Sequence, residues 1–187
     1  MRISKAPEVR KQEMIDTAMR LFARKGYEAT SMTDIAKEMH VVSGLCYRYF
    51  SSKEELYNTA LQVYGKENAA SLIAILNRED LGFEEIFMLL GEHFIMTDGK
   101  EKYYNFFHKS GNEMFHRELE MIMNKELLPH IISLLKRTKE KEQFQIDDVE
   151  STAKFLLYGQ MPILNDNSLG PEEKFRIVTA LCKKVLY

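Results

Sequence analysis

The apolar residues of this 187-residue chain recur at helical spacing along most of its length. Between residues 8 and 25, apolar side chains return every three or four positions, and Gly26 follows as a helix stop. Two short apolar faces come next, in residues 31–39 and 42–50, with a turn at His40 between them. No stretch shows the alternation of a half-buried strand. The pattern predicts an all-α fold.

The remaining two thirds of the chain continue the helical pattern. Asp147 or Asp148 is expected to cap one helix, Met161-Pro162 to end or bend it, and Gly170-Pro171 to open the last. Pro129 is expected to kink the longest helix. The three helices described above and six later ones give a prediction of about nine helices. The later six cover residues 53–77, 83–96, 102–109, 112–141, 148–160 and 171–187.

The two short helices of residues 31–50 predict a DNA-binding element. Ser31 followed by Asp34 has the form of a capping box, which starts the first of them. Helices this short bury too little surface to be stable alone, so they need flanking helices. Two short helices joined by a tight turn form a helix-turn-helix, whose second helix enters the major groove.

Specific residues of this region follow a known order and spacing: Gly26-Tyr27, Thr30-Ser31, Asp34-Ile35-Ala36, Val41, Gly44, Tyr47-Arg48-Tyr49-Phe50 and Ser52-Lys53-Glu54-Glu55-Leu56. Over roughly residues 8–60 the chain resembles the amino-terminal DNA-binding domain of the TetR family of transcriptional repressors. The resemblance implies a helix-turn-helix domain in residues 1–53. It implies an effector-binding and dimerisation domain in residues 54–187.

The DNA contacts predicted from helix position and resemblance are Ser31, Thr33, Ser43, Gly44, Leu45, Tyr47, Arg48, Tyr49 and Lys53. The resemblance implies that Tyr47 and Tyr49 place hydroxyls against phosphates and that Lys53 also contacts the backbone. Gly44 would allow the helix to approach the duplex closely. Tyr49 has an alternative interpretation, as a core aromatic beside Phe50.

Three residues depart from the family pattern. His40 replaces the usual glycine of the turn, where a positive φ is expected. Val42 replaces a serine that commonly caps the second helix, and Leu45 replaces a small or hydroxylated residue. Leu45 could meet a thymine methyl group. These departures leave the operator sequence open, and they motivate an alternative function without DNA binding.

The charge distribution agrees with a DNA-binding amino terminus. The net charge is −2, but residues 1–53 hold 10 Lys and Arg against 6 Asp and Glu, while the rest of the chain is acidic. Attraction to phosphates is electrostatic and local, so a basic head on an acidic body fits this function. The two cysteines, Cys46 and Cys182, lie far apart, and no 18-residue apolar window occurs. We therefore expect a cytoplasmic protein with no membrane segment.

The body is expected to bind a small apolar or amphipathic effector and to form a homodimer through the last two helices, both as the resemblance implies. A symmetric operator also requires two heads about one helical turn apart. The candidate effector-pocket residues are the aromatics Phe94, Tyr103, Phe107, Phe115 and Tyr158. Each of them can equally be read as ordinary core.

Signals for catalysis or for cofactors are absent. The histidines His93, His108, His116 and His130 lack zinc-type spacing, and no glycine-rich phosphate loop or nucleophile elbow occurs. His108 and His116 are eight residues apart, but Gly111 is expected to interrupt the helix between them. We expect no catalytic residues, no metal and no cofactor.

Together these observations predict a DNA-binding transcriptional regulator, a repressor that binds a palindromic operator in double-stranded DNA as a homodimer and is released by a small-molecule effector. The alternative is a helical ligand- or protein-binding protein with a degenerate DNA-binding head.

Overall fold

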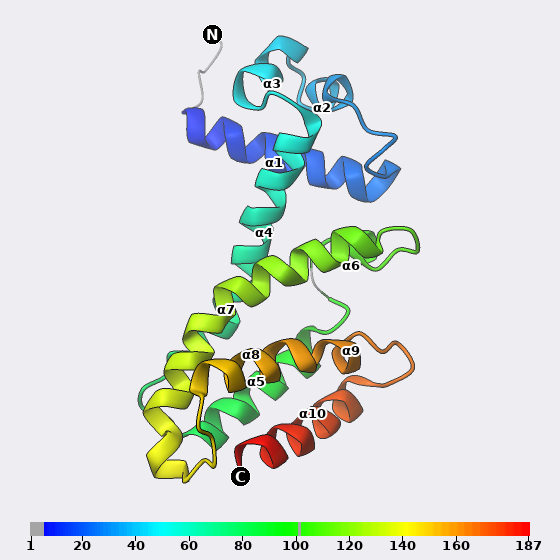
Figure 1. The fold of residues 1–187 in the computed structure, drawn as a ribbon. Helices are drawn as coiled ribbons and strands as arrows, with labels where there is room; N and C mark the ends of the chain where they lie inside the picture. The colour runs from blue at the N-terminus through cyan, green and yellow to red at the C-terminus, as the bar shows by residue number, and fades with distance from the viewer. Residues whose placement is uncertain (1–5, 101) are drawn as a thin grey trace. The chain divides into compact units, whose positions relative to one another are not determined.

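The computed structural model describes residues 6–100 and 102–187, and its regular structure is entirely helical (Figure 1). The nine predicted helices are all present, and a further four-residue helix, α9, follows α8. The ten helices of the described residues are α1 (Pro7–Lys25), α2 (Met32–Glu38), α3 (Ser43–Tyr49), α4 (Lys53–Leu76), α5 (Phe83–Thr97), α6 (Tyr104–Phe107), α7 (Glu113–Glu142), α8 (Val149–Gly159), α9 (Met161–Leu164) and α10 (Pro171–Leu186).

Local sequence signals set most helix ends. Gly26 has φ 93° at the end of α1, as its stop role requires. The Asp148 carboxylate accepts from the amides of Glu150 and Ser151 and so caps α8. Pro171 is the first residue of α10, where its missing amide hydrogen costs nothing. α7 is one helix through Pro129.

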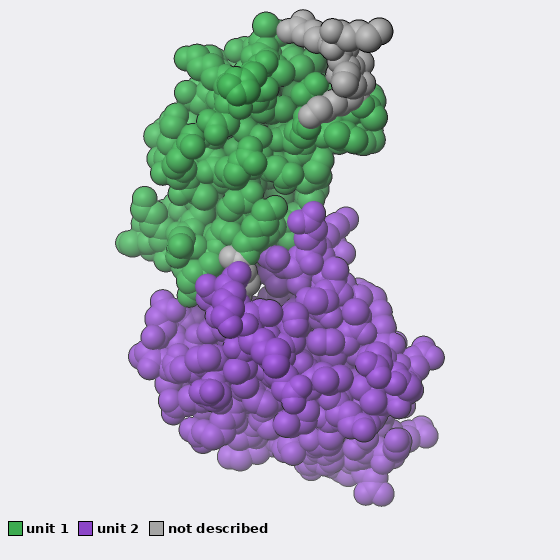
Figure 2. Space-filling view, turned by 180° about the vertical axis from the view of Figure 1, so that it is seen from behind, with its two compact units in different colours: residues 1–65, 102–119 green, residues 66–101, 120–187 purple. Residues whose placement is uncertain are grey.

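The chain divides into two compact units (Figure 2). Unit 1 comprises residues 1–65 and 102–119, and unit 2 comprises residues 66–101 and 120–187. α4 and α7 each contribute residues to both units. The first compact unit therefore extends beyond residue 53 and includes a second stretch of chain. The functional division at residue 53 stays a prediction.

Unit 1 contains a continuous set of touching aromatic rings, which we call the aromatic cluster. The Tyr57 ring lies 5.1 Å from the Tyr27 ring and 5.2 Å from the Phe115 ring, measured between centroids. The hydroxyl of Tyr57 donates to Glu118 Oε2 at 3.3 Å. The cluster thereby joins residues 1–65 to residues 102–119, and its members are Phe22, Tyr27, Tyr57, Tyr64, Tyr103, Phe106, Phe107 and Phe115.

Unit 2 has its own apolar core, formed by buried residues of α4, α5, α7, α8 and α10 together with Phe144 and Ile146. α5 and α10 pack closely at Gly91. A Cβ atom at Gly91 would lie 2.1 Å from Cζ of Phe175, and the Phe175 ring stacks on Phe87 at 5.7 Å. Only a residue without a side chain fits this contact.

The variant Gly91→Ala is expected to lower the free energy of unfolding by about 1–3 kcal/mol, because Phe175 must move out of its packed position. Gly159→Ala is the matched control. A Cβ at Gly159 has no neighbour within 4 Å, so alanine should be neutral or stabilise α8 by up to ~1 kcal/mol. Denaturant unfolding at one fixed protein concentration measures both. Equal free energies of unfolding for the two variants would contradict the close packing of α5 on α10 at Gly91.

Candidate nucleic-acid interface

A complete capping box starts α2. The amide of Asp34 donates to Ser31 Oγ at 3.1 Å, and the Asp34 carboxylate accepts from the Ser31 amide at 2.9 Å. Ser31 Oγ also donates to the same carboxylate at 2.6 Å. These hydrogen bonds from Ser31 lower the pKa of Asp34 below its ordinary value. The predicted helix start is confirmed.

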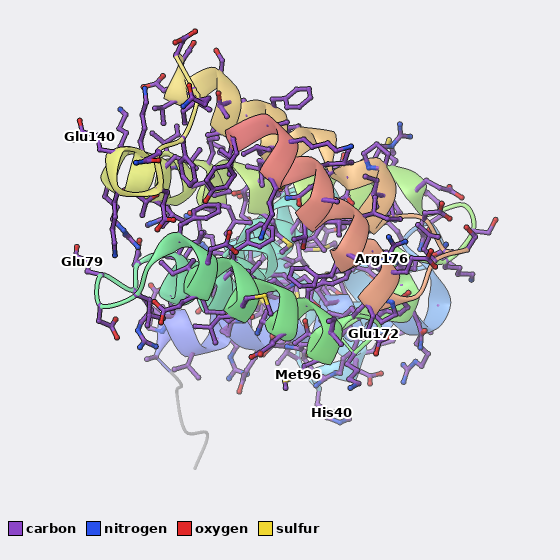
Figure 3. All side chains as sticks on the ribbon, turned by 90° about the horizontal axis from the view of Figure 1, so that it is seen from below. His40, Glu79, Met96, Glu140, Glu172 and Arg176 are labelled. Carbon is purple, nitrogen blue, oxygen red and sulfur yellow. The ribbon has the colours of Figure 1, made fainter. Side chains whose placement is uncertain are left out.

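A Schellman motif ends α2 and sets the direction of the chain into α3. The amide of Val41 donates to the carbonyl of Ala36 at 2.9 Å, and the amide of His40 donates to the carbonyl of Lys37 at 3.0 Å. This pairing requires a left-handed residue between the helix end and Val41, the position that glycine usually takes. His40 occupies it with φ 55°, so the positive φ expected there is confirmed. Its side chain points away from the helices (Figure 3).

α3 has one buried side and one exposed side. Cys46 is fully buried within it, and Phe50 is buried directly after it. Val42 occupies the N-cap position and gives no side-chain hydrogen bond, as expected from the loss of the usual serine. On the other side Tyr47 is 53% exposed and Arg48 is exposed. Cys46 thus packs α3 against the rest of unit 1. Tyr47 and Arg48 lie on its outer face, where both can form hydrogen bonds with a ligand.

The other predicted DNA contacts differ in exposure. Ser31, Thr33 and Gly44 are exposed, whereas Ser43, Leu45 and Tyr49 are half-buried. A Cβ at Gly44 would have no neighbour within 4 Å, so packing in this chain does not require a glycine there. The half-burial of Tyr49 leaves both of its interpretations open.

Lys53, the last predicted DNA contact, has an internal role that the sequence did not reveal. Its Nζ donates to the carbonyl of Tyr27 at 2.8 Å and lies 4.1 Å from the centroid of the Tyr27 ring. A cation held over an aromatic face is stabilising. Lys53 therefore ties the first turn of α4 to the loop after α1. Its contact with DNA stays a prediction.

Comparison with known proteins identifies this part of the chain. Residues 14–60 match the family model "Bacterial regulatory proteins, tetR family". These residues carry the amino-terminal domain of the TetR family. A stretch of 93 residues, 50% of the chain, is 27% identical to the biofilm operon icaADBC HTH-type negative transcriptional regulator IcaR of Staphylococcus aureus, of which it covers 49%. The chain spans about half, or less, of the length of the curated relatives that it matches.

Solved structures share the TetR-family fold over nearly the whole chain. A TetR-family transcriptional regulator from Mesorhizobium loti has a TM-score of 0.72 at 19% identity and covers 97% of both chains. RolR in complex with the ligand resorcinol has a TM-score of 0.65 at 18% identity, covering 96% of this chain and 88% of RolR. At such identities the likeness establishes the fold alone.

The candidate effector residues are divided between the two units. Tyr103, Phe107 and Phe115 belong to the aromatic cluster of unit 1, where Phe107 is buried against Tyr64 at 5.6 Å. Phe94 and Tyr158 belong to unit 2. Phe107 is therefore a core residue of unit 1, while Tyr103 and Phe115 are half-buried. An effector contact by any of the five stays a prediction.

The described residues also lack the features of two other site types. No cluster of three or more His, Cys, Asp or Glu side chains there has a metal-binding arrangement. Among the same residues, no helix has the length and apolar character that a membrane crossing requires.

The variant His40→Gly is expected to raise the melting temperature, because glycine removes roughly 1 kcal/mol of left-handed backbone strain. The greater freedom of glycine in the unfolded chain offsets part of this gain. Lys37→Gly, at an exposed position in the last turn of α2, is the control and should lose up to about 1 kcal/mol. If both variants were destabilised equally, the side chain of His40 would have a stabilising contact that outweighs its strain.

Proposed function

We propose that this TetR-family protein is a DNA-binding transcriptional regulator that represses transcription by occupying a palindromic operator as a homodimer. The observation that carries the proposal is the outer face of α3, with exposed Tyr47 and Arg48, within the residues matched by the family model. The negative regulator IcaR among its relatives supports repression. This function places the protein in the cytoplasm with DNA and gives it no catalytic role.

In this function α3 lies in the major groove. Arg48 would reach a guanine edge or a phosphate, and the Tyr47 hydroxyl would donate to a phosphate. Ser31 and Thr33 lie at the start of α2, where further polar contacts would fix the register. The absence of a side chain at Gly44 would bring the helix backbone close to the duplex.

The substitutions Tyr47→Phe and Arg48→Ala test the interface. An operator is first selected from random double-stranded DNA, and affinity is then measured by fluorescence anisotropy over a range of salt concentrations. Loss of one neutral hydrogen bond in Tyr47→Phe should weaken binding by roughly 2- to 10-fold. Arg48→Ala should weaken it by about tenfold or more, and the salt slope should fall by about 0.9 if Arg48 contacts a phosphate.

Arg78→Ala is the matched control for charge, because Arg78 is exposed in the loop between α4 and α5, outside α3 and the proposed dimer helices, and should not alter affinity. Lys53→Ala is unsuitable as a first test, since it removes the internal contact with Tyr27. Selection that enriches no sequence, under conditions with and without candidate ligands, would favour the alternative of a ligand- or protein-binding protein with a degenerate head. Val42 and Leu45 motivate that alternative.

Exposed apolar side chains on the last two long helices support the proposed dimer. Phe155 is 64% exposed and Tyr158 is 45% exposed on α8, and Leu181 is 48% exposed on α10. Phe155 and Tyr158 are three residues apart and so share a face of α8. A second copy that covers these side chains would bury apolar surface at about 25 cal/mol per Å².

The variant Phe155→Glu is expected to shift the dimer towards monomer, because dimerisation would bury an unpaired carboxylate. Met121→Glu is the control, since Met121 on α7 is equally exposed, at 64%, and lies outside the proposed interface. Sedimentation equilibrium of the two variants measures the effect. A monomeric wild-type protein, or a Phe155→Glu variant as dimeric as the control, would contradict this interface.

We further propose that a small apolar or amphipathic effector binds in unit 2 and lowers operator affinity. The structural neighbour RolR, crystallised with resorcinol, supports a small ring compound as the first class to screen. α4 and α7 belong to both units and provide continuous routes for coupling. Because such coupling is reciprocal, operator DNA weakens effector binding by the same factor.

A further inference from the structure

Three rings lie in contact where α6 meets α7 in unit 1. The rings of Tyr104 and His108 have centroids 3.8 Å apart and are nearly parallel, at 21°. The ring of His116, from the first turn of α7, lies 4.3 Å from that of His108 at an interplanar angle of 52°. Gly111, with φ 92°, turns the chain between the two histidines. The interruption expected from Gly111 is present, and the turn brings the two imidazoles together.

The hydrogen bond of His108 defines which of its nitrogens carries a hydrogen. His108 Nδ1 lies 3.1 Å from the carbonyl oxygen of Tyr104. Since a carbonyl oxygen only accepts, Nδ1 carries the hydrogen and donates. In the neutral ring Nε2 then has a lone pair. Metal-binding histidines commonly have this arrangement, with one nitrogen donating to a backbone carbonyl and the other binding the ion.

The separation of the two imidazoles is close to that of a metal chelate. Two rings bound to one ion through metal–nitrogen bonds of about 2.0–2.1 Å have ring centres roughly 4.5–5 Å apart. The observed separation is 4.3 Å. Because His108 is exposed and His116 is half-buried, small side-chain rotations can open the remaining few tenths of an ångström, and an ion can enter from solvent.

We propose that His108 and His116 form a two-histidine site for a divalent transition-metal ion of the Zn²⁺, Ni²⁺ or Cu²⁺ class. Imidazole nitrogen suits these ions, whereas Mg²⁺ and Ca²⁺ prefer oxygen ligands. Nearby Glu113 is not needed as a ligand, because its Oε1 already accepts from the amide of Gly111 at 3.0 Å. Water molecules complete the coordination of the ion.

Metal binding at this site would join α6 to α7. Lys102, just before α6, pairs with Asp16 of α1 at 3.8 Å, and the Tyr103 hydroxyl donates to the carbonyl of Asp16 at 3.5 Å. Residues 102–108 therefore pack against α1 within unit 1. An ion that crosslinks His108 to His116 fixes this segment and should raise the melting temperature of the protein.

The test is a calorimetric titration of full-length, untagged protein, freed of metal with a chelator, with Zn²⁺ and then Ni²⁺. We expect one ion per chain, and we expect His108→Ala and His116→Ala each to weaken binding by at least about tenfold. His93→Ala and His130→Ala are the matched controls. The His93 ring is hydrogen-bonded to the Ser71 hydroxyl, and the His130 ring is hydrogen-bonded to the Asn77 side chain. Removal of either ring should not change the affinity for the metal ion.

His108→Phe separates ligation from ring stacking, because it keeps an aromatic ring between Tyr104 and His116 but removes the nitrogen ligand. It should fold like the wild type by circular dichroism and bind metal as weakly as His108→Ala. Electron paramagnetic resonance of the Cu²⁺-loaded wild type should show two nitrogen ligands. The proposal is overturned if the wild-type protein does not bind saturably, or if either histidine can be removed without loss of affinity.

Discussion

The aromatic packing around Tyr57 is the interaction on which unit 1 depends. α2 and α3 have seven residues each, too few to be stable in isolation; α3 packs on α2, and α2 packs on the longer α1. α1 is joined in turn to α4 and α7 through the rings of Phe22, Tyr27, Tyr57 and Phe115. Burial raises the pKa of Tyr57 far above its usual range, and the nearby Glu118 carboxylate adds to that shift. The orientation of α3 therefore depends on residues more than 60 positions further along the chain.

Local interactions account for the features that were predicted from sequence. The capping box of Ser31 and Asp34, the stop at Gly26, the cap at Asp148 and the proline that opens α10 each involve residues within four positions of one another. Such signals can be read directly from the order of residues. The strain at His40 was also foreseeable, because the turn of a helix-turn-helix commonly requires a left-handed residue there.

Two features that the sequence did not reveal depend on distant partners, and a third depends on the geometry of a turn. Lys53 carries no local sign that its ammonium group lies over the Tyr27 ring. Phe107 carries no local sign that its ring is buried against that of Tyr64 on α4. His108 and His116 are brought together by the turn at Gly111, and their spacing in sequence matches no metal motif. Tertiary packing determined the first two contacts, and the backbone conformation of Gly111 determined the third.

The composition of unit 1 from two separate stretches has a consequence for biosynthesis. The ribosome releases residues 1–65 well before residues 102–119, since chains are made at about 5–20 residues per second. During that interval Tyr27 and Tyr57 lack the Phe115 ring that packs on them in the finished protein. The helix-turn-helix thus emerges early but completes its core only after the start of α7 has been synthesised. A nascent chain that stalls within the first hundred residues would expose these aromatic rings to chaperones and to other unfinished chains.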